Sequence, residues 1–309
     1  MGDLLKSFTA GFSRFALTWL LPSGAFLLAI WLLLAPQWGI SRSLVAIDDW
    51  AGAVGSAVVL ALVSVVTTLV FSFASLPVYR FLEGYSLPHP VRRAWTRRQL
   101  IRKRRLTAIA TKLSSASSQA NARAVCMEQL SQYPQTDSLI LPTRLGNAYK
   151  ALESYGYEQF GLDSQSLWYE LQAVSSERLR QDSDDARASV DFFISLTVYL
   201  GIYSILALAT FALSAFSGIV DYVAIISGAL AVPLSRWSYL SAVRNTTDWR
   251  WSVQALVHVN RKALANALGY RVPTSLKAER ELWQAWSAMA NRRAQSLARL
   301  DRLRLPPES

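Results

Sequence analysis

Acidic and histidine side chains are the residues of this sequence that could do general acid–base or metal chemistry, and their spacing supports neither. Asp163, Glu170 and Glu177 fall within one helical stretch, a spacing more typical of a solvated or ion-paired helix face than of paired catalytic carboxylates. The two histidines, His89 and His258, are far apart and lack Cys or acidic neighbours at the spacing of a zinc site. The sequence therefore predicts no metal and no cofactor.

The common catalytic motifs are missing as well. The sequence has no Walker loop, no G-x-G-x-x-G opening a helix, no G-x-S-x-G elbow and no H-E-x-x-H. The single cysteine, Cys126, cannot form an intramolecular disulfide, and we expect it to be a small buried residue of a helix. The sequence thus favours a protein that is not an enzyme.

The elements that must carry any function are four apolar runs, which predict an all-α polytopic membrane protein with four transmembrane helices in two hairpins and a helical cytoplasmic region. Hydrophobic residues make up 52% of the chain, and the mean hydropathy of +0.20 is high for a soluble protein. A transmembrane helix needs about 20 apolar residues. The expected spans are about 15–35, 54–76, 190–215 and 219–236.

The positions of lysine and arginine residues predict how these spans are oriented across the membrane. These basic residues follow the second and fourth runs and are absent between the third and fourth, so the positive-inside rule places the long middle segment and both termini in the cytoplasm. The predicted organisation is hairpin 1 (1–80), a basic helical cytoplasmic region (81–188), hairpin 2 (189–236) and cytoplasmic C-terminal helices (237–309).

Breakers and caps predict the helices on the cytoplasmic side. The middle segment is expected to contain helices over 90–113, 143–155 and 164–180, with 113–124 either a weak helix or a loop and an interruption at 134–142. The fourth span is expected to continue past Pro233 as one long helix until Gly269 supplies a left-handed C-cap. A last helix, 276–303, is expected to be capped by Thr274 or Ser275.

A run of basic residues after span two is the strongest charge feature of the chain. Arginines cover nearly every face of the expected helix, which needs an anionic surface or acidic partner helices. Nucleic acid is disfavoured because stacking aromatics are missing apart from Trp95. The residues of this lipid-headgroup or acidic-partner patch are Arg92, Arg93, Arg97, Arg98, Arg102, Lys103, Arg104 and Arg105.

Hydroxyl and small side chains along span two form a candidate pore lining. The same residue types also serve helix–helix packing in membranes, and for any single residue packing is favoured over a pore. The spans carry no charged residue near their middle, which disfavours a proton-coupled pump. The candidate pore residues are Ser64, Thr67, Thr68, Phe71, Ser72 and Ser75.

Glu83, Arg144 and Asn147 form a candidate polar cluster below the membrane. We expect a structural ion pair between the hairpin and the cytoplasmic helices, and a gate is the alternative.

Four short motifs carry a resemblance. They are Leu82-Glu83-Gly84-Tyr85, Leu141-Pro142-Thr143-Arg144-Leu145-Gly146-Asn147, Phe160-Gly161-Leu162-Asp163, and the stretch from His258 through Leu268-Gly269-Tyr270 to Pro273. Together they resemble an uncharacterised family of bacterial four-span membrane proteins. The resemblance implies a multi-pass protein of the bacterial inner membrane, with no catalytic residue carried across. The layout is also similar to that of bestrophin-type anion channels, as an analogy of layout only.

The sequence favours a membrane-anchored signalling, scaffold or effector protein that works through its cytoplasmic helices. Its expected partners are membrane lipids, further copies of itself and a cytoplasmic protein. The alternative is an oligomeric anion channel lined by span two, and a membrane-bound enzyme ranks last.

Overall fold

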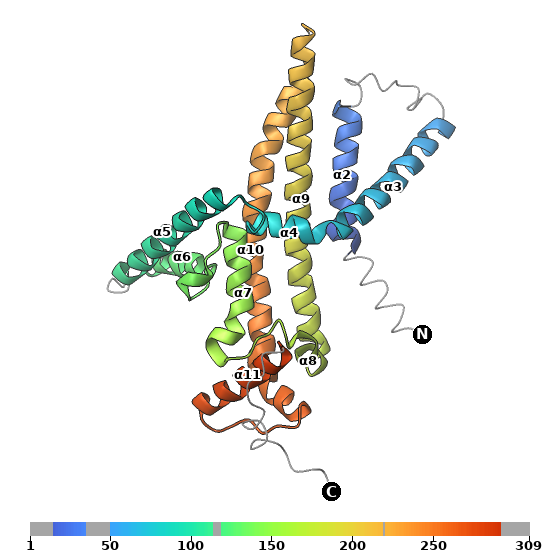
Figure 1. The fold of residues 1–309 in the computed structure, drawn as a ribbon. Coiled ribbons are helices and arrows are strands. Elements are labelled where there is room, and N and C mark those ends of the chain that lie inside the picture. The colour runs from blue at the N-terminus through green and yellow to red at the C-terminus, as the bar shows by residue number, and fades with distance from the viewer. Residues whose placement is uncertain (1–14, 35–49, 114–118, 219, 292–309) are drawn as a thin grey trace. The chain divides into compact units, whose positions relative to one another are not determined.

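The computed structural model describes residues 15–34, 50–113, 119–218 and 220–291, and no β-strand is present in these ranges (Figure 1). The predicted all-α class is confirmed. The helices are η1 (Ala16–Leu20), α2 (Leu21–Ala29), η2 (Ile30–Leu34), α3 (Trp50–Phe73), α4 (Ser75–Glu83), α5 (His89–Leu113), α6 (Ala120–Ser131), η6 (Asp137–Leu139), α7 (Arg144–Phe160), α8 (Trp168–Ala173), α9 (Glu177–Phe216), α10 (Tyr222–Ala267) and α11 (Leu276–Ala290).

Among the described residues, three helical segments are long and apolar enough to cross a membrane: Ala16–Leu34, Glu177–Phe216 and Tyr222–Ala267. A fourth is present if Ala57–Phe73 and Ser75–Glu83, which meet at 57°, count as one broken span. The break follows from Pro77, which has no backbone N–H to donate to the Phe73 carbonyl and whose ring would clash with it. Helix α3 therefore ends at Phe73.

The chain divides into two units. Unit 1 contains residues 1–79 and 188–244, and unit 2 contains residues 80–187 and 245–309. Helices α9 and α10 each contribute residues to both units.

Hydroxyl groups join the helices of unit 1. The Ser23 and Thr68 hydroxyl oxygens, from α2 and α3, lie 2.5 Å apart and are buried. The Ser195 hydroxyl of α9 donates to the Thr18 carbonyl of η1 at 2.9 Å. Such contacts can hold apolar helices together in a lipid bilayer, because lipid tails are as apolar as the helix surfaces and the hydrophobic effect gives no driving force for their association.

A separate hydrophobic core organises unit 2. Its centre is Trp283 of α11, which is fully buried among leucines and valines of the 162–171 segment and α10. The Trp283 indole N–H donates to a Glu279 carboxylate oxygen at 3.3 Å, and Arg261 donates to the same oxygen at 2.9 Å. The Arg261 guanidinium also lies 3.7 Å from the centre of the Phe160 ring. The buried charge is therefore paired and hydrogen-bonded, as burial requires.

Two helix boundaries differ from the prediction. The helix that starts at Arg144 passes through Gly156 and ends with the left-handed Gly161 as its C-cap. There the Leu162 N–H donates to the Gly156 carbonyl at 3.2 Å, and an added Cβ on Gly156 would lie 2.5 Å from the Leu162 carbonyl oxygen. The predicted 164–180 helix is instead split into α8 and the start of α9. At the split, Ser175 donates to the Leu171 carbonyl and accepts from the buried Asn260 amide.

Other boundaries match. Helix α10 continues through Pro233 to Ala267, and Gly269 has the left-handed φ of 79° expected of a C-cap. Ser275 caps α11 by accepting from the Ala278 N–H. The predicted extension of this last helix beyond residue 291 and residues 114–118 of the undecided 113–124 segment lie outside the described residues, whereas the end of that segment, from Ala120, is helical and belongs to α6.

Candidate functional site

The end of α4 and the start of α7 meet within unit 2 in a close glycine-mediated contact. Gly84 has a left-handed φ of 92°, and an added Cβ would lie 2.4 Å from Pro142 Cγ. A Cβ on Gly146 would lie 2.4 Å from the Glu83 carbonyl oxygen. Two of the motifs noted in the sequence are therefore in contact. We call this region, residues 80–85 together with 141–153, the α4–α7 junction.

Asn147 and Thr143 fix the backbone of the α4–α7 junction. The Asn147 side-chain oxygen accepts from the Leu141 N–H at 2.8 Å, and its amide donates to the carbonyls of Leu141 and Thr143 at 2.9 and 2.7 Å. The Thr143 hydroxyl accepts from the Gly146 N–H at 3.0 Å, which makes Thr143 the N-cap of α7. Asn147 is fully buried, so its role in the predicted cluster is to hold this turn.

Ionisable side chains surround Glu83 at the α4–α7 junction. Lys150 pairs with Glu153 at 3.2 Å, one turn along α7. Burial and, to a smaller extent, the Glu153 carboxylate raise the pKa of the Glu83 carboxyl to about 7, against the lowering effect of Lys150 and Arg80. Tyr85 shares the site, and burial raises the pKa of its phenol above the ordinary value. Glu83 therefore titrates near neutral pH, as groups at functional sites often do.

The sequence identified only part of this cluster. Glu83 and Asn147 lie at the junction as expected, and Arg144 is half-buried at the first turn of α7. The cations that act on the Glu83 pKa, however, are Lys150 and Arg80. Lys150 follows Asn147 by three residues, so helical spacing from the predicted residue could have pointed to it.

The third motif also lies at a packing contact. Gly161 has a left-handed φ of 77°, and an added Cβ would lie 2.7 Å from the Arg280 carbonyl oxygen of α11. Ser287 of α11 donates to the Gly161 carbonyl at 3.1 Å and accepts from the Asp163 N–H at 2.8 Å. The motif therefore joins the end of α7 to α11.

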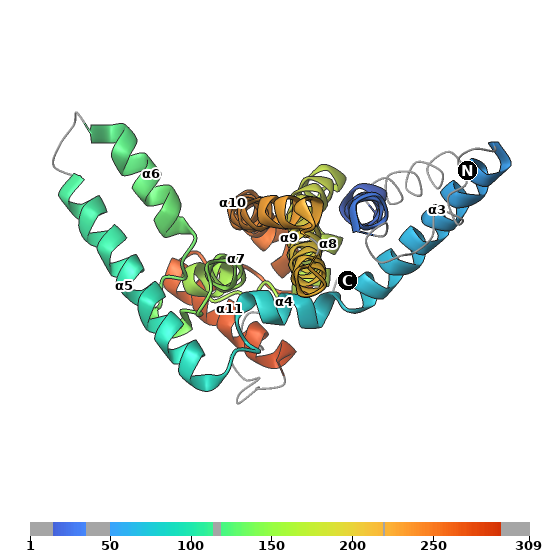
Figure 2. The same cartoon turned by 90° about the horizontal axis from the view of Figure 1, so that it is seen from above.

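A second candidate site is the exposed face of α5, which forms a helical hairpin with α6 (Figure 2). Ile101, Arg105 and Ile109 follow one another at intervals of four along this face and are all exposed. Trp95 is also exposed. The exposed basic residues of the helix are Arg92, Arg93, Arg97, Arg98, Arg104, Arg105 and Lys112.

Part of the predicted basic patch has a structural role. Lys103 donates to the Asp137 carboxylate and to the Gln135 carbonyl, both at 2.7 Å. Arg104 approaches the same carboxylate at 3.4 Å. Four other exposed arginines of α5, namely Arg93, Arg97, Arg98 and Arg105, form no ion pair within the described ranges. These four are available to a partner.

Three of the six candidate pore residues are buried inside unit 1. Thr68 donates to the Ser64 carbonyl at 2.7 Å and contacts Ser23. Phe71 packs against Tyr199 with ring centroids 4.9 Å apart. Thr67, Ser72 and Ser75 are partly exposed. The three buried residues therefore make contacts between helices of one chain. Such packing is the role that the sequence analysis favoured over a pore for any single residue.

The residues considered above for acid–base, thiol or metal chemistry form hydrogen bonds or ion pairs with other residues of the chain. The Tyr155 hydroxyl and His258 Nε2 lie 2.7 Å apart, and the Glu177 carboxylate pairs with Arg180 at 2.7 Å. The Asp163 carboxylate accepts from the Gln165 N–H and the Asn291 amide. Cys126 is buried, and its thiol donates to the Leu106 carbonyl. No group of three or more metal-ligating side chains occurs in the described part of the chain.

Comparisons with known proteins found no match. No protein-family model, no curated protein and no solved structure corresponds to this chain. The resemblance to a bacterial four-span family stays a prediction, and function has to be argued from the two sites above.

Proposed function

We propose that the protein is a non-enzymatic, membrane-anchored scaffold of the bacterial inner membrane whose α5 face binds anionic lipid headgroups. In this proposal unit 1 forms four spans in two hairpins, with both termini and unit 2 in the cytoplasm. The basic flanks that follow the second and fourth apolar runs support this orientation. Assembly into a homo-oligomer and binding of a cytoplasmic protein partner belong to the same proposal.

The observation that carries the proposal is the concentration of charge on the α5–α6 hairpin. Residues 84–127 contain ten Lys and Arg and no Asp or Glu, in a chain whose net charge is +11. The segment begins soon after the proposed end of span two at Leu76. Basic residues in this position are attracted to the anionic cytoplasmic leaflet by about 1 kcal/mol each.

The pattern of the α5 face supports a lipid surface over nucleic acid. Ile101 and Ile109 stand between arginines on the exposed face, the arrangement by which an interfacial helix inserts apolar side chains while its cations contact headgroups. Trp95 is the one aromatic residue of the helix. Single-stranded nucleic acid needs several stacking platforms along a basic groove.

The experiment measures docking of α5 with the full chain in nanodiscs. Ala108 is exposed on this helix and is replaced by Cys to carry an environment-sensitive fluorophore, while the native Cys126 is buried. We expect a blue-shifted emission in discs containing phosphatidylglycerol, relative to discs of phosphatidylcholine alone. Replacing Arg93, Arg97, Arg98 and Arg105 by Gln should abolish the shift, because four cations at about 1 kcal/mol each correspond to about a 10³-fold change in the docking equilibrium.

A matched variant controls for net charge. Four exposed cations elsewhere in unit 2, Arg178, Lys262, Arg271 and Lys277, are replaced by Gln. This variant should keep the blue shift, and added salt should reduce the shift in the wild type. Equal emission in the two lipid mixtures, or equal loss in both quadruple variants, would overturn the proposal.

We favour a scaffold over an anion channel, because the candidate pore residues Ser64, Thr68 and Phe71 make contacts within one chain. Ion flux from liposomes containing the purified protein tests it. A flux that falls on Thr67→Val or Ser72→Ala, the partly exposed positions, would favour a pore over a scaffold.

A further inference from the structure

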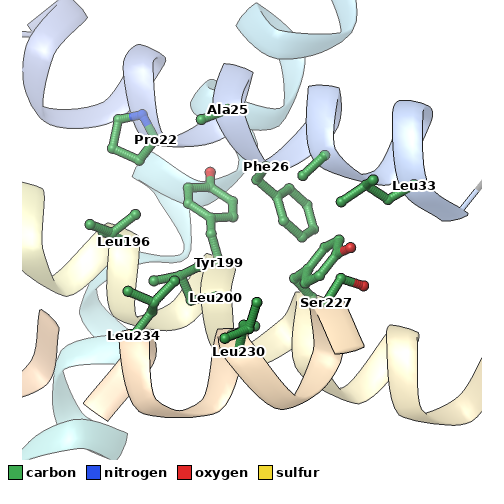
Figure 3. Close-up of a pocket in the computed structure, with 13 residues that line it drawn as sticks. Pro22, Ala25, Phe26, Leu33, Leu196, Tyr199, Leu200, Ser227, Leu230 and Leu234 are labelled. Atoms are coloured by element: carbon green, nitrogen blue, oxygen red, sulfur yellow. The ribbon is translucent and has the colours of Figure 1, made fainter. Parts of the chain in front are cut away.

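An apolar cavity of about 240 Å³ lies within unit 1, between α2–η2, α9 and α10 (Figure 3). Helix α2 contributes Pro22, Ala25 and Phe26, and Figure 3 shows Tyr199 of α9 in the middle, with Leu230 of α10 on the opposite side from α2. Three separate segments of the chain therefore enclose one space.

Few polar groups line the cavity. The Ser227 hydroxyl is engaged with the Ala224 carbonyl at 3.3 Å. The Tyr199 and Tyr203 hydroxyls are buried and have no hydrogen-bond partner among the described residues. The remaining lining residues are aliphatic, apart from the Phe26 ring. A charged or strongly polar ligand would lose its hydration here with only these two phenol hydroxyls to compensate.

The cavity has a buried floor and an exposed rim. Tyr203 and Ala231 on the floor are only 5% and 3% exposed, whereas Leu230 and Leu234 on the rim are 59% and 50% exposed. The helices that line it are the apolar segments able to cross a membrane. In a bilayer the rim would face lipid, so an occupant can enter sideways from the hydrocarbon.

We propose that this cavity binds one hydrocarbon chain of a bilayer phospholipid. An apolar cavity stays dry even at about 150 Å³ and then takes up apolar molecules, and an empty space of this size would deprive its lining of van der Waals contacts. A flexible acyl chain is the apolar molecule that surrounds unit 1 when it is embedded in a bilayer. The inference rests on the membrane location of unit 1 and is independent of the α5 face.

The test is lipid retention measured by native mass spectrometry. The full chain is reconstituted in vesicles of phosphatidylethanolamine and phosphatidylglycerol, extracted in mild detergent and washed. We expect one phospholipid to remain per chain, identified by its mass and so distinguished from a free fatty acid or a detergent molecule. Ala25→Phe, which adds a ring at an exposed lining position, should reduce the retained lipid to less than a tenth.

Ala229→Phe is the matched control, because Ala229 is exposed on α10 close to the cavity but does not line it. It should retain lipid as the wild type does. If Ala25→Phe does not fold, as judged by circular dichroism, Leu230→Trp narrows the rim instead and carries the same expectation. A wild type that retains no phospholipid, a filled cavity that retains as much as the wild type, or equal loss in Ala229→Phe would each overturn the proposal.

Discussion

Replacing Glu83 by Gln should stabilise unit 2 above pH 7 and leave its stability unchanged below about pH 4.5. In the folded protein the pKa of Glu83 is raised from 4.5 to about 7 by burial and by the Glu153 carboxylate. The folded state therefore binds this proton more tightly than the unfolded chain does. Stability of the wild type then falls as the pH rises through this window, and the full penalty is present above pH 7. Gln is neutral at every pH and avoids the penalty.

The size of the effect follows from the same values. A change in pKa from 4.5 to about 7 corresponds to at most about 3 kcal/mol of unfolding free energy. Glu83 is only partly buried, so solvent screens part of this, and we expect a gain of about 1–2 kcal/mol for Glu83→Gln above pH 7. Lys150→Gln should raise the pKa of Glu83 further, because the Lys150 charge lowers it.

The assay is denaturant unfolding of the full chain in detergent micelles at several pH values between about 4 and 8.5, followed by tryptophan fluorescence. The relevant quantity is the difference in unfolding free energy between Glu83→Gln and the wild type. Glu128→Gln, at an exposed position of α6, is the control and should show no pH-dependent difference. A Glu83→Gln difference that does not change with pH, or a loss of stability above pH 7, would refute this account of the α4–α7 junction.

Three further substitutions test the packing described above, each by the change in unfolding free energy under the same conditions. Gly146→Ala places a Cβ 2.4 Å from the Glu83 carbonyl oxygen and should destabilise by about 1–3 kcal/mol, whereas Gly55→Ala, with open space around it, should not. Asn147→Ala leaves the partly buried N–H and C=O groups of Leu141 without their side-chain partner and should cost about 1–3 kcal/mol; a neutral result would contradict the bonding. Trp283→Ala empties the centre of unit 2 and should cost about 3–5 kcal/mol, with a smaller loss counting against a single core.

Local sequence patterns determined the helices and many of their ends. The apolar runs, the Ser275 cap and the left-handed Gly269 were predictable, because each depends on residues within one or two turns of the chain. The continuation of α10 through Pro233 was also predictable, since no other breaker precedes Gly269. The same local reasoning placed a basic helix after the second apolar run.

Tertiary contacts decided the rest. The expected 164–180 helix is split where the Ser175 hydroxyl accepts from the Asn260 amide, 85 positions away. Which hydroxyls of α3 are buried depends on the position of α2, and the ionisable neighbours of Glu83 depend on how α7 meets the end of α4. These contacts join residues 45 to 85 positions apart, whereas periodicity and capping rules reach only along one helix. The sequence alone therefore specified the helices, and only their packing determined the cavity of unit 1 and the titrating cluster of unit 2.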